Sequence, residues 1–364
     1  SRAGPFAGAR LMFSSHVFGY WGDYVFWWVL LLSLFVHTWC FFKFFPWKKR
    51  RKTGLVAGNT LILFCLLGIA AMVGETYLRF VYVGTDVFGA SLPARRWFAL
   101  HTKLNSFGCR DVEWIPHKPE NVRRIAFVGD SFAYGWGIER VENRFTEQIA
   151  ARFDRRSPGS VEVMNVTKPG WGTAAQLTPV KDLVDRFQVD EVVLCYVLND
   201  IEPLLPVSED FNPLQPPDPV ILDPDRSCLF DYLYRTFWIP RVPAVRGYRD
   251  WLVAGFANEE IWLHHQRQLG EIVQYCRSRG VVFRVALLPF LHLTGGEFPA
   301  RELHAQVREF FDRIGVDTLD LLPTVAGRAA GELIVNRRDP HPNELAHQLF
   351  AQAIWDRFYA EPTD

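Results

Sequence analysis

The sequence has few cysteines and none of the cysteine patterns that bind zinc. Its six cysteines are scattered, with no CxxC pair and no Cys/His spacing of a zinc site. Cys40 and Cys65 lie inside apolar runs, and Cys195 lies in a segment typical of a buried strand, where cysteine packs as a small apolar residue. We therefore expect no metal and no other cofactor, and the sequence leaves open one disulfide among the six.

The chain also lacks a net charge and a phosphate-binding loop. It has 40 basic and 40 acidic residues, so charge gives no indication of a nucleic-acid partner. The run Gly135-Trp136-Gly137 has neither the lysine nor the spacing of a phosphate loop. The informative property is instead the uneven distribution of apolar residues, because residues 24–73 hold nearly all of the continuous apolar sequence.

Two runs in this region are long enough to cross a membrane. Tyr24 to Phe45 contains one charge, Lys43, and Leu55 to Val73 contains none. About 20 apolar residues, at ~1.5 Å each, cross the ~30 Å hydrocarbon layer of a bilayer. A cleaved signal peptide is disfavoured because a second run follows directly and no small-residue cleavage pattern is present. We predict two transmembrane helices within residues 24–73.

The loop between the two runs indicates their orientation. Residues 46–54 include the uninterrupted basic stretch from Lys48 to Lys52. Such loops stay in the cytoplasm, and each cation gains about 1 kcal/mol near anionic lipid headgroups. We therefore expect a multi-pass protein of the cytoplasmic (inner) membrane that contacts membrane lipid. The N-terminal segment 1–23 and everything after Val73 then face the extracytoplasmic, or periplasmic, side.

After a connecting segment, residues 74–121, strand and helix signals alternate through residues 122–360. The near-continuous apolar run from Val192 to Leu198 is typical of a parallel strand covered on both faces. The alternation predicts an α/β domain with a parallel sheet in a three-layer α/β/α arrangement. Five strands are expected near residues 124–128, 161–166, 191–198, 281–288 and 317–319, and five helices near 142–153, 174–187, 259–279, 299–314 and 343–359.

One stretch, about residues 201–251, interrupts this alternation. It begins with a segment rich in proline and aspartate and continues with an aromatic segment, Phe230 to Trp251. Long connections without regular structure are usually functional or mobile. Two interpretations stay open: a lid or substrate-binding insertion, and a docking surface toward the membrane or a partner protein.

Polar residues that suit acyl transfer follow the predicted strands. Ser131 comes just after the first strand, where open α/β sheets bind ligands, and it is a candidate nucleophile. His341 is the candidate base, and Asp339 is the candidate carboxylate that orients the imidazole. The backbone N–H groups of Ser131 and Gly170 and the side-chain amide of Asn199 are candidate oxyanion donors.

With these four positions, Ser131, Gly170, Asn199 and His341, the sequence resembles the SGNH, or GDSL-type, hydrolase family over roughly residues 122–357. The run from Gly129 to Gly137 is the most specific part of the resemblance. The resemblance implies a flavodoxin-like fold, a serine nucleophile with a His–Asp pair, and esterase or acyl-transfer activity.

The sequence departs from the family pattern at two places. Val197 stands where the third motif usually has glycine, and Arg338 stands where an aspartate usually precedes the histidine by three residues. Asp339, two residues before His341, resembles the Asp-x-His arrangement of SGNH-like proteins that acetylate exopolysaccharides. Whether Asp339 or another carboxylate orients His341 stays open.

Three functions are compatible with these residues. The first is a membrane-anchored serine esterase that removes acyl groups, such as acetyl, from a glycan or lipid through an acyl-enzyme on Ser131. The second is an O-acyltransferase that modifies an exported polysaccharide together with a membrane partner, because two spans are too few to move an acyl donor across the membrane. The third is a non-catalytic assembly or binding subunit with a hydrolase fold.

Overall fold

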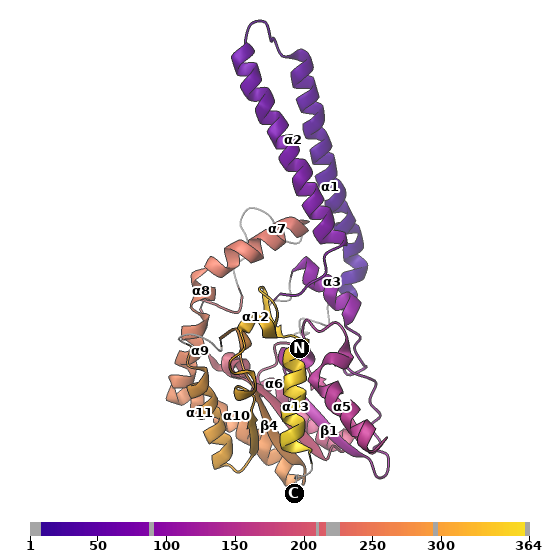
Figure 1. Ribbon diagram of the computed structural model, residues 1–364, viewed down its shortest axis with the longest axis vertical. Helices are drawn as coiled ribbons and strands as arrows, with labels where there is room; N and C mark the ends of the chain where they lie inside the picture. The colour runs from indigo at the N-terminus through magenta and orange to yellow at the C-terminus, as the bar shows by residue number, and fades with distance from the viewer. Residues whose placement is uncertain (1–8, 87–90, 209–210, 216–225, 294–297, 361–364) are drawn as a thin grey trace. The chain divides into compact units, whose positions relative to one another are not determined.

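A computed structural model describes residues 9–86, 91–208, 211–215, 226–293 and 298–360 (Figure 1). The chain forms two compact units. The first consists of Ser1–Gly84, Ala90–Arg96 and Pro216–Arg241, and the second of Thr85–Gly89, Trp97–Gln215 and Val242–Asp364. All six cysteines lie among the described residues and carry free thiols.

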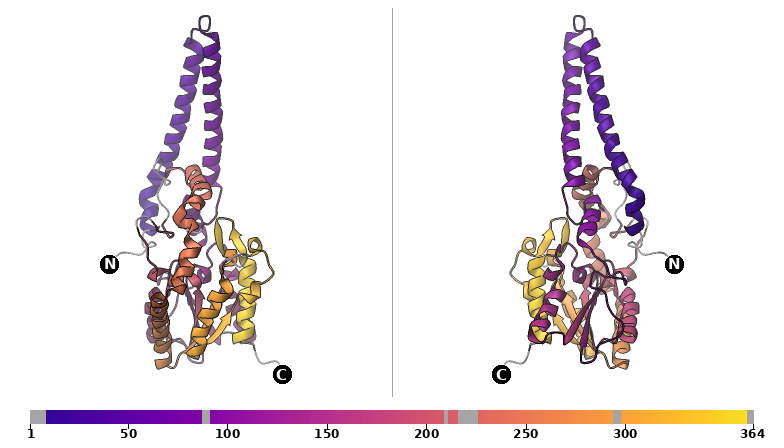
Figure 2. Two further views of the ribbon diagram at one scale, coloured as in Figure 1. Left: turned by 90° about the vertical axis from the view of Figure 1, so that its left-hand side faces the viewer. Right: turned by 90° about the vertical axis from the view of Figure 1, so that its right-hand side faces the viewer.

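The first unit contains an antiparallel pair of long helices, α1 (Ala9–Phe44) and α2 (Arg51–Phe80) (Figure 2). Both are long and apolar enough to cross a membrane, α1 from Trp21 onward. Hydrogen bonds between Tyr24 and Thr76 at 2.8 Å and between Thr38 and Cys65 at 3.3 Å join them. The predicted apolar runs thus lie within a helical hairpin whose second helix continues past Val73.

The first unit also includes a short helical segment from later in the chain. It consists of α7 (Cys228–Leu233), one π-helical turn (Tyr234–Trp238) and one 3₁₀ turn (Ile239–Arg241). The stretch 201–251 is therefore divided between the units, because its remaining part belongs to the second unit. Residues 209–210 and 216–225 of this stretch lie outside the described residues.

The second unit contains a five-stranded parallel sheet with the order β2-β1-β3-β4-β5. This is the strand order of flavodoxin-like folds. The strands lie within one or two residues of their predicted positions and are β1 (Arg123–Gly129), β2 (Val161–Thr167), β3 (Glu191–Val197), β4 (Val282–Leu288) and β5 (Asp317–Asp320). The predicted parallel α/β fold is confirmed.

Helices cover both faces of the sheet. Phe127 of β1 contacts Phe145 of α5 on one face, where α13 also packs. On the other face, Tyr196 of β3 contacts His265 of α10 and Phe311 of α11. The helices of this unit are α4 (Ser131–Tyr134), α5 (Phe145–Arg156), α6 (Thr173–Phe187), α8 (Pro243–Arg246), α9 (Tyr248–Ala257), α10 (Glu259–Ser278), α11 (Ala300–Arg313), α12 (Ala330–Leu333) and α13 (Glu344–Phe358).

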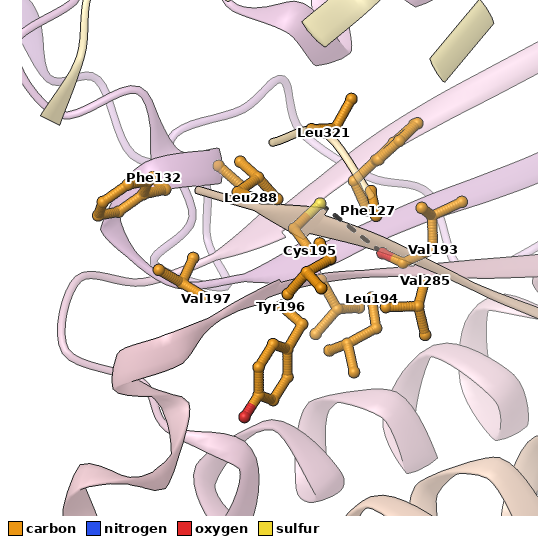
Figure 3. Close-up of a cluster of buried hydrophobic side chains, with 14 of the residues drawn as sticks. Phe127, Phe132, Val193, Leu194, Cys195, Tyr196, Val197, Val285, Leu288 and Leu321 are labelled. Atoms are coloured by element: carbon orange, nitrogen blue, oxygen red, sulfur yellow. Dashed lines mark hydrogen bonds between the residues drawn. The ribbon is translucent and has the colours of Figure 1, made fainter. Parts of the chain in front are cut away.

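The core sits around the central strand β3, every residue of which is buried. Figure 3 shows Leu194 and Tyr196 directed to one side of the sheet and Cys195 to the other. Because such a strand packs apolar side chains on both faces, its sequence lacks the polar–apolar alternation of a half-exposed strand. The rigid centre of the sheet therefore lies directly beneath the loops that follow β1 and β3.

Several elements were not predicted, among them helix α3 (Leu92–His101) and the two short strands β6 (Ile334–Asn336) and β7 (Asp339–Pro342). Helix α3 lies within the segment 74–121, which was expected only to connect the membrane helices to the domain. Strands β6 and β7 form a separate antiparallel hairpin. Two of the four residues in β7 are prolines, and proline is disfavoured within sheets because it cannot donate a ladder hydrogen bond. This small hairpin carries Asp339 and His341.

Candidate active site

The strand order explains why three of the predicted site residues share one edge of the sheet. Strand β1 lies between β2 and β3, and its last residue, Gly129, is in register with Thr167 and Cys195. A Cβ at position 129 would lie 2.9 Å from the Cβ of Cys195, so only glycine fits there. The chain segments that carry Ser131, Gly170 and Asn199 consequently start from neighbouring points on the same rim.

The structure brings Ser131, His341 and Asp339 together in a buried chain of hydrogen bonds. Nε2 of His341 lies 2.7 Å from Oγ of Ser131, and Nδ1 lies 2.5 Å from Oδ1 of Asp339. The same carboxylate oxygen accepts the backbone N–H of His341 at 3.2 Å. The imidazole is thus held at both nitrogens, although 210 residues separate it from the serine in the sequence.

Local capping fixes both ends of this arrangement. Ser131 is the first residue of α4, and Asp130 caps the helix by accepting the N–H of Phe132 at 2.9 Å. Asn343 caps α13 by accepting the N–H of Ala346 at 3.1 Å. A cap restricts how the chain enters a helix. The serine and the histidine therefore sit at defined positions relative to the helices next to them.

The predicted oxyanion donors lie in the loops after β1, β2 and β3. Gly170 is exposed and has a φ of +76°, a conformation that glycine adopts readily. Asn199 lies in the 3₁₀ segment Leu198–Leu204, and its amide donates a hydrogen bond to Asp130 at 3.0 Å. This hydrogen bond engages one of the two N–H groups of the amide.

Buried carboxyl groups lie next to the 3₁₀ segment that carries Asn199. Burial raises the pKa of Asp130, while its hydrogen bonds from Asn199 and Phe132 oppose the shift. Asp200 accepts hydrogen bonds from Gln176 at 3.1 Å and from the N–H of Val197 at 3.3 Å. These contacts tie the 3₁₀ segment to α6 and to the end of β3, and so fix the backbone that carries Asn199.

A second carboxyl group in the same segment, Glu202, was not singled out from the sequence. Burial raises its pKa to about 7. It accepts a hydrogen bond from the Tyr248 hydroxyl at 2.6 Å, which joins the segment to α9. A carboxyl group that titrates near neutral pH therefore lies close in sequence to Asn199.

Sequence reasoning missed two residues that surround the His–Asp pair. The Thr85 hydroxyl donates a hydrogen bond to Oδ2 of Asp339, the oxygen that His341 does not use. The ring of Trp136 stacks on the imidazole at 5.2 Å, and its indole N–H donates to the carbonyl of Asp86 at 3.2 Å. No local signal marks Thr85, because its partner is 254 residues away. Trp136 lies within the opening motif, so its position was an available signal.

Val197, the residue at the usual glycine position, is fully buried at the end of β3. Its backbone is extended, with φ −124° and ψ 151°, which any residue adopts. Figure 3 shows its side chain among the apolar residues of the core. The valine is thus accommodated by packing without a strained backbone.

These observations define a class of protein. A serine hydroxyl, an imidazole and a carboxylate in hydrogen-bonded sequence, at the carboxyl-terminal rim of a flavodoxin-like sheet, form the arrangement of a serine hydrolase. The chain belongs to the GDSL-like Lipase/Acylhydrolase family, whose sequence model matches residues 127–349. It is accordingly an SGNH-type hydrolase.

Several solved structures resemble the chain at low sequence identity. TesA is 13% identical, with a TM-score of 0.43 over 65% of this chain and 98% of that chain. The psychrotrophic esterase EstA from Pseudoalteromonas sp. is 12% identical, with a TM-score of 0.41 over 65% and 96%. The acetyl xylan esterase AlAXEase is 13% identical, with a TM-score of 0.41 over 65% and 99%. Comparison with curated protein sequences gave no match.

Proposed function

We propose that this protein is a membrane-anchored serine esterase that removes acyl groups from a glycan or lipid outside the cytoplasmic membrane. The observation that carries the proposal is the 2.7 Å contact between Nε2 of His341 and Oγ of Ser131. A serine hydroxyl becomes a competent nucleophile when a base is within hydrogen-bond reach and is itself oriented by a third group. Asp339 is the third group here.

In the acylation step, Oγ of Ser131 attacks the carbonyl carbon of the ester while Nε2 of His341 takes the hydroxyl proton. The carbonyl oxygen becomes an oxyanion, which the N–H groups of Ser131, Gly170 and Asn199 stabilise. Loss of one such donor typically costs about 2.7–4 kcal/mol of transition-state stabilisation. The C–O bond to the alcohol then breaks, and His341 returns the proton to the departing oxygen.

In the deacylation step, a water molecule takes the place of the alcohol. Its proton passes to His341, its oxygen attacks the acyl carbon, and the bond to Oγ breaks as the proton returns to the serine. Asp339 stays ionised throughout and stabilises the imidazolium that forms in each step. The products are a carboxylic acid and an alcohol, so the proposed reaction needs neither an oxidant nor a cofactor.

The site of action follows from the helical hairpin. The apolar helices α1 and α2 are joined by a basic loop, and basic loops of this length remain in the cytoplasm. The second unit carries Ser131 and His341 and is called the catalytic unit below. In this proposal it lies on the extracytoplasmic side. Alkaline phosphatase fused after residue 360 should be active, whereas a reporter that works only in the cytoplasm should be silent. The opposite pattern would contradict the proposed orientation in the membrane but not the proposed reaction.

The acyl-enzyme provides the direct test of the chemistry. The full chain in lipid nanodiscs is mixed with p-nitrophenyl acetate, quenched in acid during turnover, digested and analysed by mass spectrometry. We expect acetylation of the peptide that contains Ser131, and no acetylation of that peptide in Ser131→Ala. Ser157→Ala, a change at an exposed serine outside the site, is the matched control and should behave as the wild type.

The same assay separates the two remaining functions. Product release that rises only when an acceptor oligosaccharide is added, with the acyl group recovered on the sugar, would replace the esterase by an O-acyltransferase. Absence of any acetylated Ser131, with p-nitrophenol released equally by wild type and Ser131→Ala, would favour a non-catalytic subunit.

A further inference from the structure

The α7 segment, residues 226–241, is fixed to the end of α2 within the first unit. The Glu75 carboxylate accepts the N–H of Leu229 at 2.8 Å, the hydroxyl of Ser227 at 2.9 Å and the N–H of Cys228 at 3.2 Å. Arg79 donates to the same carboxylate at 2.7 Å, and both side chains are buried. A buried charge pair with this many donors holds the start of α7 in one place.

Further contacts join the α7 segment to both long helices. The carbonyl oxygen of Arg226 accepts hydrogen bonds from Arg79 of α2 at 3.2 Å and from the indole of Trp27 of α1 at 3.0 Å. A Cβ at Gly74 would lie 3.3 Å from the side chain of Leu229, so the glycine leaves room for close packing. The segment therefore belongs structurally to the hairpin.

The position of Glu75 along α2 indicates the depth in the membrane at which the α7 segment is attached. The 22 residue steps from Lys52 to Gly74, at ~1.5 Å each, cover about 33 Å, close to the ~30 Å thickness of the hydrocarbon layer. If the basic loop lies at the cytoplasmic headgroups, Glu75 and Arg79 lie at the headgroups of the opposite leaflet. The start of the α7 segment, residues 226–229, is held at that same level.

The part of the segment directed away from these contacts is apolar. Leu233 and Phe237, four residues apart, are 42% and 56% exposed, and the adjacent Trp238 is 60% exposed. Asp231 and Arg235 form an ion pair at 2.7 Å elsewhere on the helix. Exposed aromatic and aliphatic side chains with cations nearby are typical of helices that lie in a membrane interface. A tryptophan suits this layer because its ring is apolar and its N–H is polar.

We propose that the α7 segment lies in the outer headgroup layer of the bilayer that α1 and α2 cross, with Leu233, Phe237 and Trp238 immersed in lipid. The occupant of this apolar face is the lipid surface, because the face continues from the apolar hairpin and is held at the level where α2 leaves the hydrocarbon. The inference rests on the proposed membrane anchor. The segment is then a third membrane contact, in addition to the two spanning helices.

The test uses the full chain in vesicles of phosphatidylcholine and phosphatidylglycerol. A Cys40→Ser background removes the one half-buried native thiol, since the other five cysteines are buried. The environment-sensitive dye NBD is attached in turn to Phe237→Cys and Trp238→Cys. Two matched controls are Leu66→Cys, exposed in the middle of α2, and Leu263→Cys, exposed on α10 of the catalytic unit. Nitroxides at shallow and deep positions of the lipid chain quench the dye by depth.

We expect the dye at positions 237 and 238 to emit at shorter wavelength than at position 263, and to be quenched more by the shallow nitroxide than by the deep one. The dye at position 66 should be quenched most by the deep nitroxide. Water-like emission at 237 and 238 with deep quenching at 66 would overturn the interfacial assignment and leave the anchor intact. Water-like emission at all positions would overturn the anchor itself.

Two further outcomes also contradict the proposal. Stronger quenching of positions 237 and 238 by the deep nitroxide would mean that the segment enters the hydrocarbon. Water-like emission in pure lipid vesicles, combined with a blue shift only in native membranes, would mean that a protein covers the face in place of lipid. Because each substitution lies at an exposed position, the labelled proteins are expected to fold like the parent.

Discussion

Two buried histidines of the catalytic unit, His341 and His304, each pair with a carboxylate in nearly the same geometry. Nδ1 of His341 lies 2.5 Å from Asp339, and Nδ1 of His304 lies 2.7 Å from Asp320. The pairs differ at the other ring nitrogen. Nε2 of His341 meets the Ser131 hydroxyl, whereas Nε2 of His304 is buried and has no hydrogen-bond partner among the described residues.

Both imidazoles are oriented by a carboxylate, but only that of His341 also contacts a serine hydroxyl in the part of the chain that the structure describes. His304 lies on α11 and pairs with the last residue of β5, the edge strand of the sheet. His341 lies on a separate hairpin and reaches the loop after β1, which is next to the central strand β3. The crevice of a doubly wound sheet forms at this central point and not at its edge. In the proposed mechanism, the position of His341 beside Ser131 makes its pair reactive, whereas the His304 pair is expected to be structural.

The largest expected effect comes from the hydroxyl that distinguishes the pairs. Ser131→Ala should lower kcat for p-nitrophenyl acetate by about 10⁴–10⁶-fold, since removal of a serine nucleophile leaves only binding and oxyanion stabilisation. His304→Asn should leave kcat within about twofold of wild type, because the His304 ring contributes to packing and takes no part in the proposed reaction. Comparable losses in both variants, with unchanged circular dichroism, would contradict the difference in role between the two histidines.

The two carboxylates provide the next comparison. Asp339→Asn keeps the shape of the side chain but favours the wrong imidazole tautomer, and it should lower kcat by roughly 10³–10⁴-fold. Asp320→Asn makes the same chemical change in the other pair and should lower thermal stability without lowering kcat. Steady-state kinetics and thermal melts of both variants check this. A fully active Asp339→Asn would mean that another carboxylate orients His341.

A smaller effect is expected from Thr85, for which the other pair has no counterpart in the contacts described. Thr85→Val keeps the volume but removes the hydrogen bond to Oδ2 of Asp339. Since hydrogen bonds to charged groups contribute about 1.5–3 kcal/mol, kcat should fall by about 10–100-fold. KM should stay unchanged, and Thr85→Ser, which restores the hydroxyl, should recover most of the activity. A parallel rise in KM, or failure of the serine variant, would argue for a general structural role.

The smallest effect concerns a third buried histidine, His347, which has no carboxylate partner in the contacts described. Its Nδ1 accepts the N–H of Phe145 at 3.2 Å, and burial lowers its pKa to about 3. The unfolded chain, with an ordinary histidine pKa of about 6.5, binds the proton first as the pH falls. This histidine should therefore lower the free energy of unfolding by about 2 kcal/mol between pH 7 and pH 5.

Thermal and urea unfolding at these two pH values, for wild type and His347→Gln, measure this contribution. The variant should lose less stability on acidification, whatever its stability at pH 7. His265 and His292, whose pKa values burial lowers to about 3 and about 4, supply a similar pH dependence that the variant retains. An identical pH dependence in both proteins would contradict the assignment of a neutral, buried His347.

Much of the fold was available from local patterns in the sequence. The strands of the parallel sheet were predictable because each is a short apolar run that ends at a polar or glycine-containing turn, as at Val128-Gly129. The shared edge of Ser131, Gly170 and Asn199 was predictable because each follows a parallel strand that ends there. In contrast, the hairpin of β6 and β7 was not predictable, since Pro340 and Pro342 are typical of loops and only tertiary context makes them a strand.

The contact between Thr85 and Asp339 also affects where this chain can be divided. The family match begins at residue 127, so a truncation chosen from that boundary would keep Ser131, His341 and Asp339. It would nevertheless remove the hydroxyl that donates to Asp339 and the carbonyl of Asp86 that accepts from Trp136. A soluble fragment for enzymology should therefore start upstream of residue 85, within a few residues of the end of the second long helix.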